Sequence, residues 1–583
     1  MPKPSQAARP ALPGASDINL LAWLATCISV FAFLFFYRRG EILLYGDAIA
    51  HINIARRVFD SRTPGLLQLG TVWLPLPHLL MIPFIISTAM WRSGAGGSIP
   101  SMAGYVFAVV GVFRLTRTSL TDNAEDRHTR IAAWIAAVIF AANPNLIYMQ
   151  STAMGETVYL AFFVWAVVFF ADWIRGSNSL TKCALCIAAA SLTRYDGWFL
   201  TATMTIAVLA ISVRLRRRRP FSDQNRVGAV VEADQNRGRT ITEDRKSRGR
   251  APLQGRVRDN STRGALEPVK FVLIVAAAPA LWLAYNGIVY RNPLEFANGP
   301  YSAKAIESRT QSAGNPGHPG SDHPAIAALY FLKSAENNVA QPEWLQRTWM
   351  FGGIAAVLVI TLRFRRALPL LFLLVPIPFY ALSIAYGGVP IFIPNWWPYT
   401  HYNARYGLQL LPALAIAIAF LTYLAVRAEA LPARVRLGIV LPGLVLVGVS
   451  YASIWGTDPV CLKEAQVNMR TRNQLQVEVA RWLEKLPPDS TILMYLGDQV
   501  GALERAAVPL KRSINEGNHR VWKQPADREG LWERALADPA KYADYVLAFD
   551  GDPVWQAVHD RRLHELVELH VSGQPRAVLY AAR

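Results

Sequence analysis

Four charged residues lie at the ends of long apolar runs of the sequence. They are Asp47, Glu156, Arg194 and Arg405. Charged groups near a membrane are costly unless they are paired or hydrated, so such residues are candidates for function. A carboxylate can accept a proton, and a guanidinium can hold phosphate oxygens through paired hydrogen bonds. These residues are therefore our first candidates for a site that handles protons and anions.

Each of these residues also has an ordinary structural explanation. Asp47 could cap a helix that begins beside it, and an acid such as Glu156 in the first turn of a helix favours the helix dipole. Arg194 could pair locally with Asp196, and Arg405 could extend its charged end to the membrane interface. The sequence alone leaves both explanations open.

Four further residues are weaker candidates for substrate binding. His51 follows Asp47 by one helical turn, and His78 follows a Pro-rich segment. Either could bind an acceptor or a phosphate, although a single histidine near a membrane is more often structural. Tyr301 and Lys304 lie in a long loop rich in Gly and Pro, where they could help to close over a substrate.

The elements that must position these residues are membrane helices. Hydrophobic residues make up 52% of the 583 residues and charged residues only 17%, against about 25% charged in ordinary globular proteins. This composition argues against a plain soluble enzyme and predicts an α-helical polytopic membrane protein. Eleven spans are expected, near 20–36, 99–114, 131–149, 157–174, 181–196, 197–213, 269–289, 349–362, 367–386, 407–426 and 436–455.

The basic residues predict how the chain crosses the membrane. The formal net charge is +19, but Lys and Arg gather at the ends of apolar runs, as they do in cytoplasmic loops, so nucleic acid is not an expected partner. Counting residues 72–91 as a span would move the later basic loops outside. This run carries three prolines, so we predict a re-entrant or interfacial element there. The N-terminus is then cytoplasmic and the C-terminus extracytoplasmic.

The chain is expected to have three parts. Residues 1–18 would form a cytoplasmic tail, 19–455 the transmembrane domain, and 456–583 a small extracytoplasmic α/β domain. An amphipathic helix at 462–486 and short apolar strands predict the α/β domain. Those strands are expected at 491–496, 545–549 and 577–581. The expected outer loops are 38–98, 290–348 and 387–406, and the polar stretch 214–268 is expected to be a disordered cytoplasmic loop.

Several motifs, taken in order, resemble those of the polytopic GT-C glycosyltransferases. They are Asp47 after the first span, the Trp-x-Pro-x-Pro segment at 73–77, Asn143-Pro144 and Ser151 before Glu156, and the segments 193–197, 292–296 and 403–406. The resemblance covers about residues 20–455 and is greatest to the aminoarabinose-transferase and protein O-mannosyltransferase branch. It implies a GT-C-like membrane fold.

The resemblance also implies a reaction. In that family the first-loop aspartate is the general base for an acceptor hydroxyl, and the donor is a sugar on a polyprenyl phosphate; here the base would be Asp47. Such a base contributes roughly 10²- to 10⁴-fold. The leaving lipid phosphate needs cations, for which Arg405 and Arg194 are the best-placed candidates. We therefore expect inverting sugar transfer to a hydroxyl of a lipid, glycan or protein on the outer face.

One departure from the family pattern concerns metals. The Asp-Glu pair common in the mannosyl branch is Asp47-Ala48 here, and the first two outer loops contain no Asp-x-Asp cluster. Because divalent metals need several oxygen ligands together, we predict metal-independent transfer with no cofactor beyond the lipid-linked donor. The expected partners are membrane lipids, the donor and the acceptor. The expected location is the inner membrane of a bacterium.

Two other functions remain open at this point. A transporter or flippase for lipid-linked sugars needs no base, and such proteins often consist of two related halves. We find no such internal repeat in this sequence. A non-catalytic envelope assembly protein would instead bind a partner through its C-terminal domain.

Overall fold

The computed structural model describes residues 15–120, 126–217, 255–310, 317–428, 430, 432–518 and 530–583. Most of the predicted tail 1–18 and most of the predicted loop 214–268 lie outside these residues. The end of that loop differs from the prediction, because residues 255–268 belong to the long helix α12 (Gly255–Val289).

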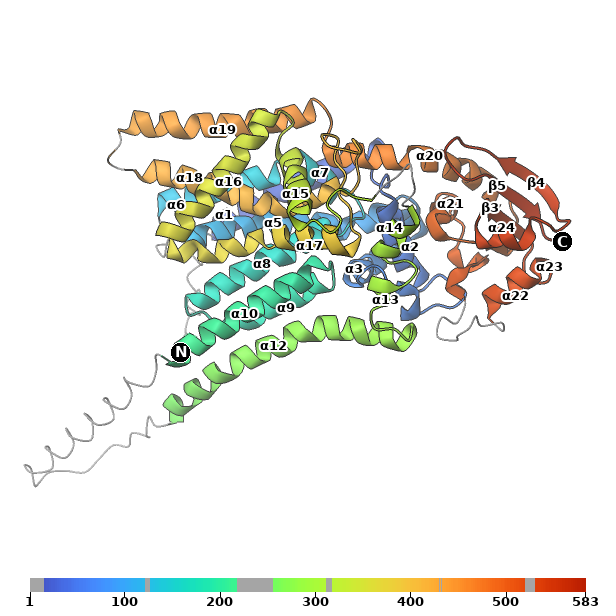
Figure 1. Cartoon of the computed structure of the whole chain (residues 1–583), viewed down its shortest axis with the longest axis horizontal. Coiled ribbons are helices and arrows are strands. Elements are labelled where there is room, and N and C mark those ends of the chain that lie inside the picture. Colours follow the sequence, from blue (N-terminus) through green and yellow to red (C-terminus); the bar gives the residue numbers. More distant parts are fainter. Residues whose placement is uncertain are drawn as a thin grey trace, which may run out of the picture.

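Long apolar helices dominate the chain (Figure 1). Within the described residues, nine helices are long and apolar enough to cross a membrane, and a bent pair raises the number to ten. Large apolar side chains such as Phe31, Ile288 and Leu362 are exposed on these helices, as contact with lipid requires. The chain is therefore a multi-pass membrane protein. Besides α12, the spanning elements are α1 (Ala15–Arg38), α5 (Ala95–Leu120), α8 (Glu156–Ile174), α10 (Asp196–Arg217), α16 (Glu343–Arg363), η2 with α17 (Arg365–Leu374 and Pro376–Gly387), η3 with α18 (Ala404–Leu410 and Leu411–Arg427) and α19 (Ala433–Trp455).

Two of the eleven predicted spans are not single long helices among the described residues. Helix α9 (Leu180–Ser191) has 12 residues and is about 18 Å long, whereas the hydrocarbon core is about 30 Å thick. The predicted span 131–149 is the bent pair α6 (Arg127–Ala141) and α7 (Pro144–Gln150), with an angle of 64°. Asn143 caps α7 by accepting a hydrogen bond from the backbone N–H of Leu146 at 3.0 Å. Pro144, the first residue of α7, has no backbone N–H with which to continue the hydrogen bonds of α6.

Short helices fill the segments between the spans on the side of the C-terminal region. The apolar run 72–91 forms two short helices rather than a membrane span, because α3 has only ten residues. The first such segment contains α2 (Gly46–Arg57), η1 (Leu66–Leu69), α3 (Leu76–Ile85) and α4 (Thr88–Arg92). A later one contains α13 (Glu295–Asn298), α14 (Ala303–Thr310) and α15 (Pro324–Val339).

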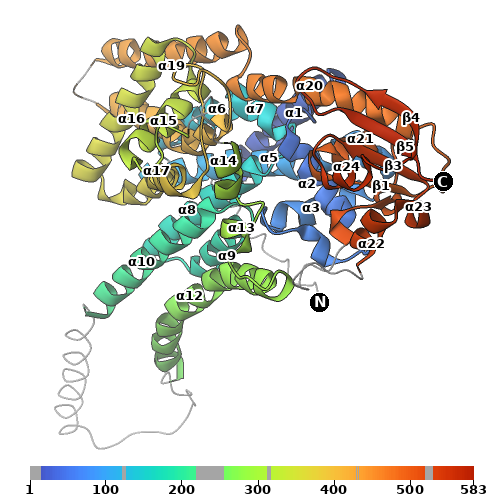
Figure 2. The same cartoon turned by 45° about the vertical axis from the view of Figure 1, so that its right-hand side comes forward.

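The C-terminal residues form an α/β unit at one end of the helix bundle, as Figures 1 and 2 show. Its five-stranded sheet has the order β2-β1-β3-β5-β4. Strand β1 is parallel to β2 and β3, and β5 is antiparallel to β3 and β4. The strands are β1 (Ile492–Met494), β2 (Ser513–Ile514), β3 (Tyr545–Phe549), β4 (His564–Leu569) and β5 (Ala577–Ala581). The helices are α20 (Val460–Leu483), η4 (Gly497–Gln499), α21 (Val500–Arg505), η5 (Leu510–Arg512), η6 (Glu516–Asn518), α22 (Leu531–Ala537), α23 (Pro539–Tyr542) and α24 (Pro553–Val558).

The C-terminal unit and the membrane helices share one apolar core. Residues of α20, β1 and β5 belong to the same buried cluster as residues of α1, α5 and α8. Helix α2 packs against both α20 and α21, so it lies between the bundle and the C-terminal unit. This arrangement brings the first outer segment, the membrane helices and the C-terminal unit together at one place.

Candidate active site

Arg405 is the centre of a buried ion-pair network. It lies in the first turn of η3, and its side chain is 6% exposed. Nη2 donates to Oδ2 of Asp47 at 2.5 Å, and Nε donates to Oε1 of Glu156 at 3.1 Å. Nη1 donates to Oε1 of Glu464 at 2.5 Å. One guanidinium therefore binds three carboxylates, from α2, α8 and α20.

Arg194 extends the network on the other side of Glu156. Its Nη1 donates to the same Oε1 of Glu156 at 3.1 Å. Its Nε lies 3.3 Å from both carboxylate oxygens of Asp196, and its Nη2 donates to the Tyr380 hydroxyl at 2.9 Å. The local pair with Asp196, which was the structural alternative, is therefore present together with an ion pair to α8.

Two tyrosine rings support the guanidinium groups. The ring of Tyr406 lies 4.7 Å from Cζ of Arg194 and 5.0 Å from Cζ of Arg405. Arg405 also faces the ring of Tyr45 at 4.9 Å. Such cation–π contacts favour a fixed orientation of the guanidinium planes.

Asp47 does not cap helix α2. The N-cap of that helix is Tyr45, and no side chain caps the first turn. The capping explanation of Asp47 is therefore wrong, and its carboxylate pairs with Arg405 instead. The side chain of Asp47 is 38% exposed, whereas that of Glu156 is 2% exposed. Asp47 is thus the accessible acid beside Arg405.

Glu156 has one carboxylate oxygen in use and one free. Oε1 accepts hydrogen bonds from both arginines, whereas Oε2 is buried and has no hydrogen-bond partner among the described residues. A buried charged oxygen without a donor is costly, and such a cost is often kept at a site that receives a ligand. Oε2 is therefore available to a donor group of a substrate.

Glu464 is the member of the network that sequence reasoning missed. Its side chain is fully buried, and it accepts hydrogen bonds from the backbone N–H of Arg405 at 3.2 Å and of Asn403 at 3.1 Å. These contacts hold the turn that leads into η3 and so direct Arg405. The available signal was an acid near Cys461 and Met469, which are on the buried side of an amphipathic helix.

The network as a whole carries excess negative charge. Four carboxylates and two guanidiniums leave a formal charge of −2 when all are ionised. Both arginines already have carboxylate partners, so an anion entering the network competes with these carboxylates. No group of three or more His, Cys, Asp or Glu side chains that could hold a metal ion occurs within the residues that the structure describes.

His51 and His78 form a buried pair beside the network. Nδ1 of His51 lies 2.8 Å from Nε2 of His78. Burial lowers the pKa of His51, partly opposed by the carboxylates of Asp47 and Glu156, and it holds the pKa of His78 well below the usual value. Both rings are therefore expected to be neutral near pH 7. Nδ1 of His78 has no hydrogen-bond partner in the described part of the chain.

Tyr301 and Lys304 contact other parts of the outer region. The hydroxyl of Tyr301 lies 3.4 Å from that of Tyr495 in the C-terminal unit. Lys304 lies in the first turn of α14, where its backbone packs beside Gly388. Neither contact involves the arginine network.

Comparison with known proteins identifies the fold. No protein-family model and no curated protein matches the chain. Among solved structures, ArnT from Cupriavidus metallidurans in the apo state matches 98% of this chain and 99% of its own, with a TM-score of 0.51 and 13% identity. The chain shares the ArnT fold. ArnT bound to undecaprenyl phosphate gives a TM-score of 0.50 at 14% identity, covering 97% of this chain and 98% of that chain.

The match with ArnT confirms the fold that the motif resemblance predicts, a GT-C-like helix bundle. Because it covers nearly the whole of both chains, it includes the C-terminal α/β unit. The roles of individual residues in the network rest on the contacts described above.

Proposed function

We propose that the protein is a membrane glycosyltransferase. It transfers a sugar from a polyprenyl-phosphate donor to a hydroxyl group of a lipid, glycan or protein. The observation that carries the proposal is the contact of the accessible Asp47 carboxylate with the buried Arg405 guanidinium. The ArnT fold supports a lipid-phosphate partner, because ArnT has been seen bound to undecaprenyl phosphate.

Asp47 acts as the general base in this proposal. A neutral hydroxyl is a poor nucleophile, and a carboxylate at hydrogen-bond distance assists it by accepting its proton. The acceptor oxygen forms a bond to the anomeric carbon while the bond from that carbon to the phosphate oxygen breaks. The electron pair stays with the lipid phosphate. Attack from the side opposite the phosphate inverts the anomeric configuration.

Arg405 couples donor binding to the availability of the base. Its Nη2 now donates to Asp47 at 2.5 Å. A guanidinium binds phosphate with the same forked geometry that it uses for a carboxylate, so a donor phosphate can replace Asp47 on Nη2. Asp47 is then free to accept a proton beside the bound donor. The buried partners Glu156 and Glu464 keep Arg405 in place during this exchange.

Glu156 and Arg194 orient the donor sugar in this proposal. The unpartnered Oε2 of Glu156 can accept a hydrogen bond from a sugar hydroxyl. Arg194 is anchored by Asp196 and Tyr380, so it holds Glu156 in a fixed position. His51 and His78 lie beside these groups, and as neutral rings they can donate or accept hydrogen bonds to the acceptor.

We place the reaction on the extracytoplasmic face of a bacterial inner membrane, with the N-terminus in the cytoplasm. The network lies at the end of the bundle that carries the C-terminal unit, away from the basic segments around Arg363 and Arg427 at the opposite ends of their helices. The transfer needs no metal in this proposal, because the network carboxylates are paired with guanidinium groups. Transfer should therefore continue at an undiminished rate in excess chelator.

Complementation tests the proposed function. We expect mass spectrometry of envelope lipids and glycans to show loss of one sugar substituent when the gene is deleted. The unaltered protein should restore it, and Asp47→Asn should not. Glu343→Gln is a matched control, because that acid is 59% exposed and pairs with Arg347 on α16. Restoration by Asp47→Asn at the unaltered level would contradict the proposal.

A further inference from the structure

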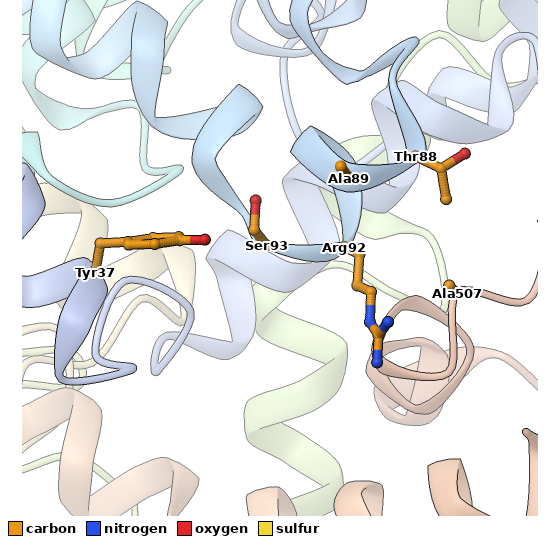
Figure 3. Close-up of a pocket in the computed structure, with 6 residues that line it drawn as sticks. All are labelled: Tyr37, Thr88, Ala89, Arg92, Ser93 and Ala507. Atoms are coloured by element: carbon orange, nitrogen blue, oxygen red, sulfur yellow. The ribbon is translucent and has the colours of Figure 1, made fainter.

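A second charged region lies where the first membrane span meets the C-terminal unit. A cavity of about 540 Å³ is bordered there by the end of α1, by α4 and by the loop after α21. Figure 3 shows the Tyr37 hydroxyl pointing toward Ser93 and the Arg92 guanidinium extending toward Ala507. The lining residues are Tyr37, Thr88, Ala89, Arg92, Ser93 and Ala507.

A smaller cavity of about 290 Å³ shares the lining residue Arg92 with the first, and we call the two together the joined cavities. Its lining adds the residues Arg481, Arg505 and Glu484. Three cations and one anion give the joined cavities a formal charge of +2. This sign is opposite to that of the arginine network, and none of the lining residues belongs to the network.

The cations of the joined cavities have few internal partners. Arg92 lies 3.3 Å from Glu484, but the two side chains are 54% and 46% exposed, so this pair is weak. Arg505 donates to Asn473 through Nη2, whereas its Nε is buried and has no hydrogen-bond partner among the described residues. The guanidiniums that an anion in the cavities can reach are those of Arg92 and Arg481, because both residues are exposed.

The position of the cavity indicates what kind of anion reaches it. Tyr37 is in the last turn of the first span, followed by Arg38 and Arg39. Aromatic and basic residues at such a point lie at the level of the lipid headgroups. The cavity volume lies within the range of about 300 to 1,000 Å³ that is usual for small-molecule sites.

We propose that the joined cavities bind the phosphate group of an anionic membrane lipid. Arg92, Arg481 and Arg505 supply the positive charge, and the hydroxyls of Tyr37 and Ser93 supply further hydrogen bonds. The lipid is held at the seam between the first span and the C-terminal unit. This site is separate from the arginine network and does not depend on the proposed sugar transfer.

Lipid binding to the purified full chain tests this proposal. Native mass spectrometry in detergent would compare phosphatidylglycerol, which is anionic, with phosphatidylcholine, which is zwitterionic. We expect preferential retention of phosphatidylglycerol, and about tenfold weaker retention in Arg92→Gln and in Arg481→Gln. Arg347→Gln is the matched control, since this exposed arginine on α16 lies outside both cavities and should bind as the unaltered chain does.

The double variant Arg92→Gln/Arg481→Gln gives the decisive comparison. Both residues are exposed, so its unfolding temperature should match that of the unaltered chain. Unchanged retention of phosphatidylglycerol in this variant would overturn the proposal, and so would equal retention of both lipids. Competition by inorganic phosphate at concentrations equal to the lipid would also overturn it, because the site would then bind soluble phosphate.

Discussion

The arginine network and the cavities around Arg92 use the same residue types in opposite ways. In the network, two guanidiniums lie among four carboxylates, and the Arg405 side chain is only 6% exposed. In the cavities, three guanidiniums face one carboxylate, and Arg92 is 54% exposed. Buried charges must be paired, whereas exposed cations can remain open to a ligand. The comparison teaches that burial holds the network arginines in place against their carboxylates, whereas exposure leaves the cavity arginines open to a ligand from outside.

The largest expected difference in stability concerns the central arginine. Arg405→Gln leaves the buried carboxylate of Glu464 without its cation and leaves Glu156 with Arg194 alone, so the free energy of unfolding should fall by about 3 to 5 kcal/mol. Arg92→Gln should change it by less than about 0.5 kcal/mol. Denaturant unfolding in detergent measures both. Equal effects in the two variants would remove the contrast between the two regions.

A smaller effect is expected at Glu464. The substitution Glu464→Gln keeps one of the two oxygens that accept from the backbone N–H groups of Asn403 and Arg405, and it removes the charge facing the guanidinium. Loss of a charge-assisted hydrogen bond should lower stability by about 1.5 to 3 kcal/mol and slow sugar transfer. Glu478→Gln on the same helix is the control. Equal effects at the two positions would show that Glu464 has no special link to Arg405.

The stability of the chain should depend on pH through Glu504, which lies between the arginine network and the cavities. Glu504 precedes Arg505 of the cavity and accepts from Nδ2 of Asn53, on the helix that carries Asp47, at 2.5 Å. Burial raises the pKa of Glu504 from 4.5 to about 8. Between pH 4.5 and 8, Glu504 is therefore ionised in the unfolded chain and protonated in the folded chain. The ionisation of Glu504 should therefore leave stability unaffected below pH 4.5 and lower it by about 1.4 kcal/mol per pH unit between pH 4.5 and 8.

The variant Glu504→Gln isolates this contribution. Its carboxamide cannot ionise, so the fall in stability between the two pKa values should largely disappear. Unfolding curves at a series of pH values would compare it with the unaltered chain. An identical pH slope in both proteins would mean that Glu504 is already ionised in the folded state.

The sequence predicted most of the long apolar helices and three of the five strands, because long apolar runs and strand-like runs are strong local signals. The strands at 545–549 and 577–581 agree with β3 and β5 at both ends. The two-residue strand β2 is too short to show any periodicity. Helix α9 was overestimated because its apolar run continues past Ser191 into a turn. Strand β4 is largely exposed, and charged residues interrupt its apolar ones, so it lacks the continuous apolar run that predicted β3 and β5.

The site was predictable only in part. Charged residues beside membrane spans must be paired, and this rule selected the residues that the structure joins through Arg405. It could not select Glu464, which lies 59 residues along the chain from Arg405 on a helix with other acids. Nor could it show that Tyr301 contacts the C-terminal unit, because the composition of a loop does not say where its side chains lie.

The transfer rate of the Asp47→Asn variant tests the central claim most directly. The purified chain would be supplied with a polyprenyl-phosphate sugar and an acceptor identified from the deletion strain, and sugar transfer would be followed by mass spectrometry. We predict a rate about 10²- to 10⁴-fold below that of the unaltered chain, in a variant that still unfolds in one cooperative transition. A rate equal to that of the unaltered chain would contradict the assignment of Asp47 as the base.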